Sequence, residues 1–354
     1  MENKLWGTLK TKALNIHLIP KTSIIEFLVL FFILIFAIII RINGLDFYSD
    51  DADSFYIYTY STAIFNYNNP YLRILDSDMI HNQKYATSPP LYFYLGMIPL
   101  YFGYSSYPSW IFFMKIFFLI PVDFGVAILI YIILKQSANN SWFRITAVFI
   151  WLVNRWGLYV YTYALIDTFT IFFILLSLYY FYSRPEVSSL LLGIAIATKL
   201  FPIFLLPFYL ISHHQKGVYK LLKYVFFALI PLFLVSLPFI VLSIPEAYFK
   251  SLLFSATRQG DSSMKIVGPE LMPFFGEEGV DTRIPLLISY LVLYLIHWKK
   301  VFNTYMFTTT GLLIWNLMNA NVYAQYWVWF IPFALILIGK IIDTGALSNP
   351  VMQI

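Results

Sequence analysis

Residues 27–40 read FLVLFFILIFAIII and form the centre of an apolar segment at about 24–42. A helix needs about 20 apolar residues to cross the roughly 30 Å hydrocarbon core of a bilayer, so this segment is long enough to span a membrane. The composition agrees, because 60% of the 354 residues are hydrophobic and 12% are charged, whereas soluble domains are about 25% charged. We therefore predict an all-α polytopic membrane protein in which residues 1–354 form a single integral membrane domain.

The chain before this segment indicates its orientation. Residues 1–21 carry four lysines, and positively charged flanks stay in the cytoplasm. The apolar run is too long for the core of a signal peptide, and no small-residue cleavage site follows it, so we predict an uncleaved first span with a cytoplasmic N-terminus. The net charge of +5 is scattered singly or in pairs, which is not the pattern of a nucleic-acid-binding surface.

Further apolar segments predict about ten transmembrane helices, some of them short or re-entrant. Those that fit single spans lie at about 109–134, 144–162, 166–182, 224–243, 285–298, 301–318 and 324–340. Residues 89–103 are apolar but short and broken by prolines, so we expect them to be interfacial or re-entrant. Residues 189–214 fit either one long span or two short helices that meet at TKLFP (198–202), where Pro202 interrupts helical hydrogen bonding.

The distribution of cations favours the two-helix interpretation. With TKLFP as a hairpin tip, and with 89–103 not crossing, the short loops that carry cations all face the cytoplasm, as the positive-inside rule requires. These cations are Lys135, Arg144, Arg184, Lys216, Lys220, Lys223, Lys299, Lys300 and Lys340. The outer face then receives two long segments. They are 43–88, in which we expect interfacial helices, and 244–284, which we expect to be a loop.

This topology gathers four unusual stretches on the outer face. They are FYSDDADSFY (47–56) with its three acids, Asp167 at the start of a span, Lys199 in TKLFP, and the aromatic NANVYAQYWVWF (319–330). Polar groups near membrane depth are costly and are usually functional. We therefore expect a cleft where these stretches meet.

Each charged group in these stretches also has a purely structural interpretation. Asp50, Asp51 and Asp53 are either acids of a solvated loop or carboxylates beside an apolar surface, where a raised pKa suits a general base. Asp167 is either an acid favoured by a helix N-terminus or a ligand-binding group. Lys199 either extends to the interface or contacts an anion such as phosphate.

Three arginines are further candidates for anion binding. Arg155 lies in an otherwise apolar stretch, so we expect it to be buried and paired with Asp123, Asp167 or a ligand anion. Arg258 and Arg283 belong to the second long segment and would add positive charge on the outer face.

Metal and cofactor sites have little support in the sequence. The chain has no cysteine, which excludes disulfides, thiolate catalysis and cysteine-bound zinc. It contains no HExxH, P-loop or GxGxxG pattern, so no metal ligands and no cofactor are assigned. A site made only of carboxylates would fit Mg²⁺ or Mn²⁺ without requiring either.

The order of these elements resembles the GT-C superfamily of polytopic glycosyltransferases. The segments that carry the likeness are DADSFYIYTYSTAIFNYNNPYLRI (51–74), YATSPPL (85–91), KLFP (199–202) and QYWVWFIP (325–332). They look like the branch that contains GPI mannosyltransferase I type enzymes and bacterial polyprenyl-phosphate-mannose-dependent mannosyltransferases, over roughly residues 25–340. One departure is Ser54, which follows the second Asp of the motif where that branch has Tyr, with Tyr56 two positions later.

The resemblance implies a glycosyltransferase that moves a hexose such as mannose from a dolichyl- or polyprenyl-phosphate carrier to an acceptor hydroxyl, with inversion. It implies a multi-pass enzyme of the plasma membrane in a prokaryote, with its active site on the outer face. The expected partners are the lipid-linked donor, the bilayer, and a glycan, glycolipid or protein acceptor, with no nucleic acid.

The same resemblance implies roles for particular residues. Asp51 is the expected general base, with Asp50 as the rival for that role and Asp53 as an orienting group. The expected substrate-binding residues are Lys199, Asp167, Arg155, Arg258, Arg283, Tyr56, Gln325, Tyr326 and Trp329.

A polytopic transporter or lipid-linked sugar flippase is the alternative. Lys115, Asp123 and Arg155, which lie within apolar segments, would then mark a pathway through the membrane. Transporters commonly contain two repeats with broken helices in matching places, and this chain shows no such symmetry. We therefore favour the transferase.

Overall fold

The computed structural model describes residues 23–48, 53–76, 85–137, 140–213, 217–257, 283–299, 302–318 and 324–344. The helices are α2 (Ile24–Ile42), α3 (Asp53–Phe65), α4 (Pro90–Tyr101), α5 (Tyr107–Met114), α6 (Ile120–Ser137), α7 (Ser141–Val153), α8 (Arg155–Thr162), α9 (Asp167–Tyr180), α10 (Pro185–Thr198), α11 (Leu206–His213), α12 (Val218–Val241), α13 (Pro245–Thr257), α15 (Arg283–Trp298), α16 (Thr304–Met318) and α17 (Ile331–Thr344). Short 3₁₀ helices form η1 (Pro70–Ile74), η3 (Phe201–Leu205) and η6 (Ala324–Trp329), and η2 (Lys115–Leu119) is a π-helical segment. The described chain contains no strand, so the all-α prediction is confirmed.

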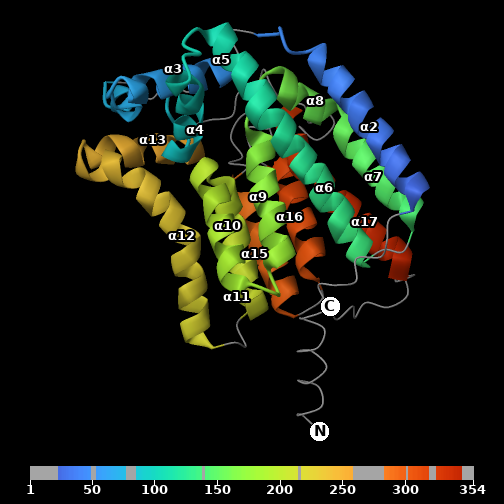
Figure 1. Ribbon diagram of the computed structural model, residues 1–354. Coiled ribbons are helices and arrows are strands. Elements are labelled where there is room, and N and C mark those ends of the chain that lie inside the picture. The colour runs from blue at the N-terminus through green and yellow to red at the C-terminus, as the bar shows by residue number, and fades with distance from the viewer. Residues whose placement is uncertain are drawn as a thin grey trace, which may run out of the picture.

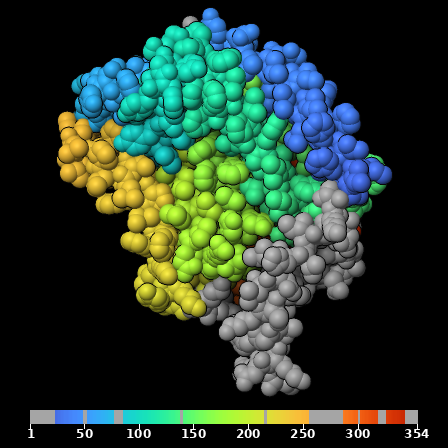
Figure 2. Space-filling view, in the orientation of Figure 1, coloured from blue at the N-terminus to red at the C-terminus, as the bar shows by residue number. Residues whose placement is uncertain are grey.

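Four segments of the described chain are long and apolar enough to cross a membrane: Ile24–Ile42, Tyr107–Gln136, Val218–Val241 and Gln325–Ile342. Other apolar helices, among them α9 and α10, are shorter. The helices α2 and α12 lie on opposite edges of the molecule (Figure 2), and many of their large apolar side chains are exposed. Exposure on this scale suits contact with lipid. The protein is therefore a polytopic membrane protein, and the number of about ten spans stays a prediction.

Charged residues lie at both ends of the helix bundle, whose elements are shown in Figure 1. Asp167 begins α9 and Lys199 follows the last residue of α10, so both lie at one end. Lys135 lies in the last turn of α6, and Arg184 is the N-cap of α10, which places both at the other end. The positive-inside arrangement predicts this separation. Which side of the membrane each end faces stays a prediction.

Residues 144–162, which we predicted as one span, are divided into two helices at Asn154. The backbone of Asn154 is extended, with ψ 142°, and its side-chain oxygen accepts a hydrogen bond from the Gly157 amide at 2.6 Å. Asn is a favoured N-cap because its side chain satisfies such an amide at the start of a helix. The single-span prediction is therefore wrong, and α8 turns away to pack against η6.

The chain breaks at TKLFP, as the two-helix interpretation requires. The helix α10 ends at Thr198, and Lys199 is extended with φ −140° and ψ 141°. Pro202 lies in the first turn of η3, where its missing N–H has no helical partner to lose. The helix α10 then packs against α9 and α12, whereas α11 packs against α15.

The first outer segment, 43–88, contains α3 and η1, which confirms that it carries helices. The helix α3 approaches α4 closely, and the Ser61 hydroxyl donates to the carbonyl of Phe93 at 2.9 Å. Gly96 permits this approach, because a Cβ there would lie 2.2 Å from Ser61 Oγ. The placement of these helices in the membrane interface stays a prediction.

The second outer segment, predicted as a loop at 244–284, begins with a helix instead. The helix α13 opens with Pro245, a favoured first residue of a helix. Its buried side chains recur at helical spacing and are Ala247, Tyr248, Ser251 and Phe254. They pack towards η1, where the Tyr71 and Tyr248 rings lie 5.0 Å apart. The loop prediction is therefore wrong for this part of the segment.

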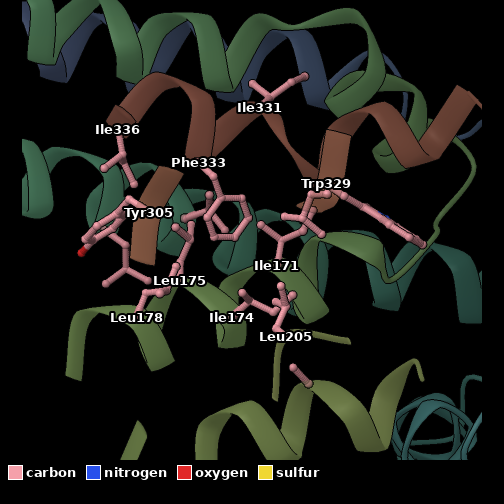
Figure 3. Packing of buried hydrophobic residues seen from close by; sticks show 14 of the residues in the cluster. Ile171, Ile174, Leu175, Leu178, Leu205, Tyr305, Trp329, Ile331, Phe333 and Ile336 are labelled. Atoms are coloured by element: carbon pink, nitrogen blue, oxygen red, sulfur yellow. The ribbon is translucent and has the colours of Figure 1, made fainter. Parts of the chain in front are cut away.

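Packing in the bundle core determines where Asp167 points. Four residues of α9 at positions i, i+3, i+4 and i+7 are at most 3% exposed: Ile171, Ile174, Leu175 and Leu178. Figure 3 shows them in one cluster with Trp329 of η6 and Phe333 of α17. Asp167 precedes Ile171 by about one turn, so it shares this buried face.

Candidate active site

Asp167 is a fully buried carboxylate whose two oxygens have different surroundings. Its Oδ1 accepts hydrogen bonds from Lys199 Nζ at 2.6 Å and from Trp329 Nε1 at 2.7 Å. Its Oδ2 has no hydrogen-bond partner among the described residues. The first turn of a helix favours a negative charge, and the two donors fix how the carboxylate is oriented.

Lys199 lies in the break between α10 and η3, and its side chain is 15% exposed. Its ammonium pairs with Asp167 and is surrounded by aromatic rings, with centroids at 5.4 Å for Trp329, 5.7 Å for Tyr326 and 5.9 Å for Tyr92. Aromatic faces attract cations, so these rings add to the pairing. The side chain does not extend alone to the interface, and its charge is already compensated.

The first outer segment reaches the same site through Asp53. Gln325 Nε2 of η6 lies 3.4 Å from Asp53 Oδ2, at the start of α3. Within η6, the Tyr326 and Trp329 rings lie 4.2 Å apart. The structure thus brings Asp53, Asp167, Lys199 and the 325–329 stretch together, as the topology predicts.

Tyr92 of α4 is a buried residue of the site whose ring centroid lies 5.9 Å from Lys199 Nζ, and the sequence did not assign it a role. Burial raises the pKa of Tyr92 well above its ordinary value, and the charges of Asp167 and Asp53 raise it further. The only sequence signal was its place just after the YATSPP step of the resemblance.

Lys115 contacts the backbone that follows α2, a few residues before the acidic segment. Its ammonium donates to the carbonyls of Gly44 and Phe47, each at 2.6 Å, just beyond the end of α2. Lys115 is buried and begins the π-helical segment η2, and such segments often occur at functional sites. The contacts fix the chain that leads to the acids of residues 50–53.

A second buried ion pair, Arg41–Asp123, holds α2 against α6. The guanidinium also donates to the carbonyl of Leu152 in α7 at 3.0 Å, and the Tyr161 hydroxyl donates to the carbonyl of Arg41 at 3.0 Å. Asp123 is therefore the partner of Arg41. We predicted a pairing of Asp123 or Asp167 with Arg155.

Arg155 is exposed as the first residue of α8, so the prediction that it is buried is wrong. The reason is the break at Asn154, which ends α7 and places the next side chain on the surface. Asp123 and Asp167 pair with Arg41 and Lys199 instead, and pairing of Arg155 with a ligand anion stays a prediction.

A family model matches residues 89–318, which is more than half of the chain. The chain belongs to glycosyltransferase family 87. This family is GT-C-like and polytopic, which confirms the superfamily resemblance, although the match does not distinguish the GPI mannosyltransferase I type. No curated protein and no solved structure is recognisably similar to the chain.

The family 87 region contains three residues of the site, Tyr92, Asp167 and Lys199. Asp53 and residues 325–329 lie outside it and join the site through the contacts given above. As a glycosyltransferase, the protein acts on a sugar donor and an acceptor, and it is embedded in a membrane.

The remaining residues that we predicted for the site are only partly described. Asp50, Asp51 and Arg258 lie outside the described residues, and so does the side chain of Arg283. Tyr56 is half-buried on α3, with its ring 5.9 Å from that of Phe55. Within the described part of the chain, no group of three His, Asp or Glu residues is arranged to hold a metal ion.

Proposed function

We propose that this family 87 glycosyltransferase moves a hexose, such as mannose, from a polyprenyl- or dolichyl-phosphate carrier to an acceptor hydroxyl. The observation that carries the proposal is the junction of the acidic first segment with the buried pair, through Asp53–Gln325 and Trp329–Asp167. The acceptor is a hydroxyl of a glycan, glycolipid or protein. The site faces the outer side of the plasma membrane of a prokaryote.

The chemistry requires one base and no strong acid. Glycoside hydrolysis uses two carboxylates because its leaving group must be protonated. A lipid phosphate leaves without that help, so a single carboxylate that takes the acceptor proton is enough. One displacement then inverts the anomeric carbon. We assign the base to Asp51, with Asp50 as its rival, and Asp53 orients the reacting groups.

Positive charge is needed where the phosphate departs. Lys199 was our first candidate, but Asp167 already compensates its charge at 2.6 Å. We therefore assign the phosphate contact to Arg258 and Arg283 of the second outer segment, which offer cations on the same side as the acids. The prenyl chain reaches the site from the bilayer.

The transporter or flippase alternative has less support. A pathway would need charged groups available along the bundle. Asp123 is paired with Arg41, Lys115 is bound to backbone carbonyls, and Arg155 is exposed. Asp123 and Lys115 therefore act as structural contacts, and Arg155 lies on the surface.

The test is transfer from radiolabelled polyprenyl-phosphate hexoses by the purified protein in nanodiscs. Asp51→Asn is expected to lower the turnover number by at least about a hundredfold, since a positioned base contributes roughly 10²–10⁴-fold. Asp50→Asn is the matched control and is expected to retain most of the activity. Full activity of a correctly folded Asp51→Asn variant would contradict the assignment of the base. Absence of transfer by the wild type from every donor would contradict the proposed function.

A further inference from the structure

We infer that Asp167 and Lys199 together bind a hydroxyl group of a pyranose sugar beside the ring of Tyr326. The inference rests on the proposed function for the nature of the ligand, and it adds a binding subsite to that function.

The first observation is Asp167 Oδ2. This oxygen is buried and has no hydrogen-bond partner among the described residues, whereas Oδ1 holds two donors. A buried carboxylate oxygen without a donor is costly, and native proteins rarely leave one. A sugar hydroxyl supplies the donor that is lacking, at a position set by the two contacts on Oδ1.

The second observation is the charge of the pair. An ammonium group has three donors, and Lys199 uses one of them on Asp167. The others can donate to the oxygen of a neighbouring hydroxyl on the same ring. Because the pair is neutral as a whole, it favours an uncharged polyol over a phosphate, which would bring a second negative charge next to Asp167.

The third observation is the aromatic wall. Trp329 is stacked on Phe201 at 3.7 Å and 7° and is almost fully buried, so its ring positions Asp167 and is not a ligand surface. Tyr326 is half-buried, and its ring lies 5.7 Å from Lys199 Nζ. The negative face of an aromatic ring attracts the polarised C–H groups of a pyranose. The subsite thus combines an acceptor, a donor and an apolar face.

The experiment measures ligand affinity by thermal shift of the full-length protein in detergent. The probes are citronellyl phosphate and its mannosyl, glucosyl and galactosyl esters. The wild type is expected to bind its best sugar ester about 10- to 100-fold tighter than citronellyl phosphate, the range of a hydrogen bond to a charged group. Asp167→Asn is expected to reduce this ratio to about one through weaker binding of the sugar ester, with citronellyl phosphate bound at least as tightly as by the wild type because the charge of Lys199 is no longer neutralised.

Two further variants separate binding from folding. Asp123→Asn breaks the Arg41–Asp123 pair and is expected to lower stability without changing the sugar-to-phosphate ratio. The double variant Asp167→Asn/Lys199→Gln leaves no unpaired buried charge and is expected to fold and to lose the ratio. A second set of measurements uses octyl glycosides, which stand for the acceptor sugar, in place of the phosphate esters. If their affinity depends on Asp167, the subsite belongs to the acceptor sugar.

Three outcomes would overturn the inference. One is a wild type that does not prefer any sugar ester or glycoside, including one that binds none of the probes. Another is an Asp167→Asn variant that keeps the ratio. The third is a Lys199→Gln variant that weakens citronellyl phosphate as much as its sugar esters, because Lys199 would then hold the phosphate. A wild type that keeps the ratio but transfers no sugar would instead contradict the proposed function.

Discussion

Two ion pairs in the described bundle, Arg41–Asp123 and Asp167–Lys199, have similar chemistry but different surroundings. Arg41–Asp123 lies where α2, α6 and α7 meet, and Arg41 also donates to the carbonyls of Ala37 and Leu152. Asp167–Lys199 lies where helices begin and end, and one oxygen of Asp167 has no partner in the described chain. Each pair leaves one buried atom without a partner in the described chain, Arg41 Nε in the first and Asp167 Oδ2 in the second. The side chains of the first pair are at most 6% exposed, whereas that of Lys199 is 15% exposed, so the second pair is the one that a ligand can reach.

The largest expected effect is on stability and concerns the Arg41–Asp123 pair. Arg41→Met leaves Asp123 charged and unpaired in the bundle, which should lower the free energy of unfolding by about 3–5 kcal/mol. The measurement is thermal or denaturant unfolding in detergent. The double variant Arg41→Met/Asp123→Leu should recover much of the loss. If Arg41→Met also abolished the preference for sugar esters, the contrast between the pairs would be wrong.

The next largest effect is on sugar transfer and concerns the orientation of Asp167 in the Asp167–Lys199 pair. Trp329→Phe removes the donor 2.7 Å from Asp167 Oδ1 and keeps the ring that stacks on Phe201. Loss of a hydrogen bond to a charged group is expected to cost about 1.5–3 kcal/mol, or at least tenfold in kcat/KM for sugar transfer. Trp327→Phe is the matched control, since its Nε1 has no partner among the described residues. Equal losses in the two variants would contradict an orienting role for Trp329.

The sequence could predict which groups meet but not how they pair. The short loops that carry cations predict the topology of the spans, because such loops stay on the cytoplasmic side. That topology places Asp53, Asp167, Lys199 and Gln325 at the opposite end of the bundle. It could not show that Asp167 compensates Lys199, since that depends on the twist of α9 against α10. The same limit explains the error for Arg155, whose exposure depends on a cap one residue earlier.

The helices were predictable to different degrees for physical reasons. The uniform apolar segment at 24–42 left no alternative to a span, and α2 occupies it. The helix α13 was missed because charged residues and the long polar segment that follows hid its buried spacing. Asn154 and Pro202 both interrupt helices, but only the proline was read as a break, because Asn is common within loops and helix ends alike.

A smaller effect on stability and turnover is expected for Lys115, which contacts the backbone before the acidic segment. Lys115→Met removes donors from the carbonyls of Gly44 and Phe47, and unsatisfied buried carbonyls are expected to cost about 1–3 kcal/mol of stability. If Lys115 positions the acids, kcat should fall several-fold while KM for the lipid-linked donor stays unchanged. Lys115→Arg, which keeps a cation, should restore part of kcat. A rise in KM alone would indicate that Lys115 serves donor binding instead.

The smallest effect is expected where the first segment touches η6. The Gln325–Asp53 contact is long, at 3.4 Å, so Gln325→Ala should change kcat/KM by only a few-fold, corresponding to less than about 1 kcal/mol. Gln325→Glu places a second negative charge beside Asp53 and should lower activity more, because like charges at this distance repel. The measurement is transfer kinetics for both variants, with thermal unfolding as a check of folding. If Gln325→Glu matched Gln325→Ala, the charge of Asp53 would not matter for transfer. The acidic segment would then meet the buried pair only as a packing contact.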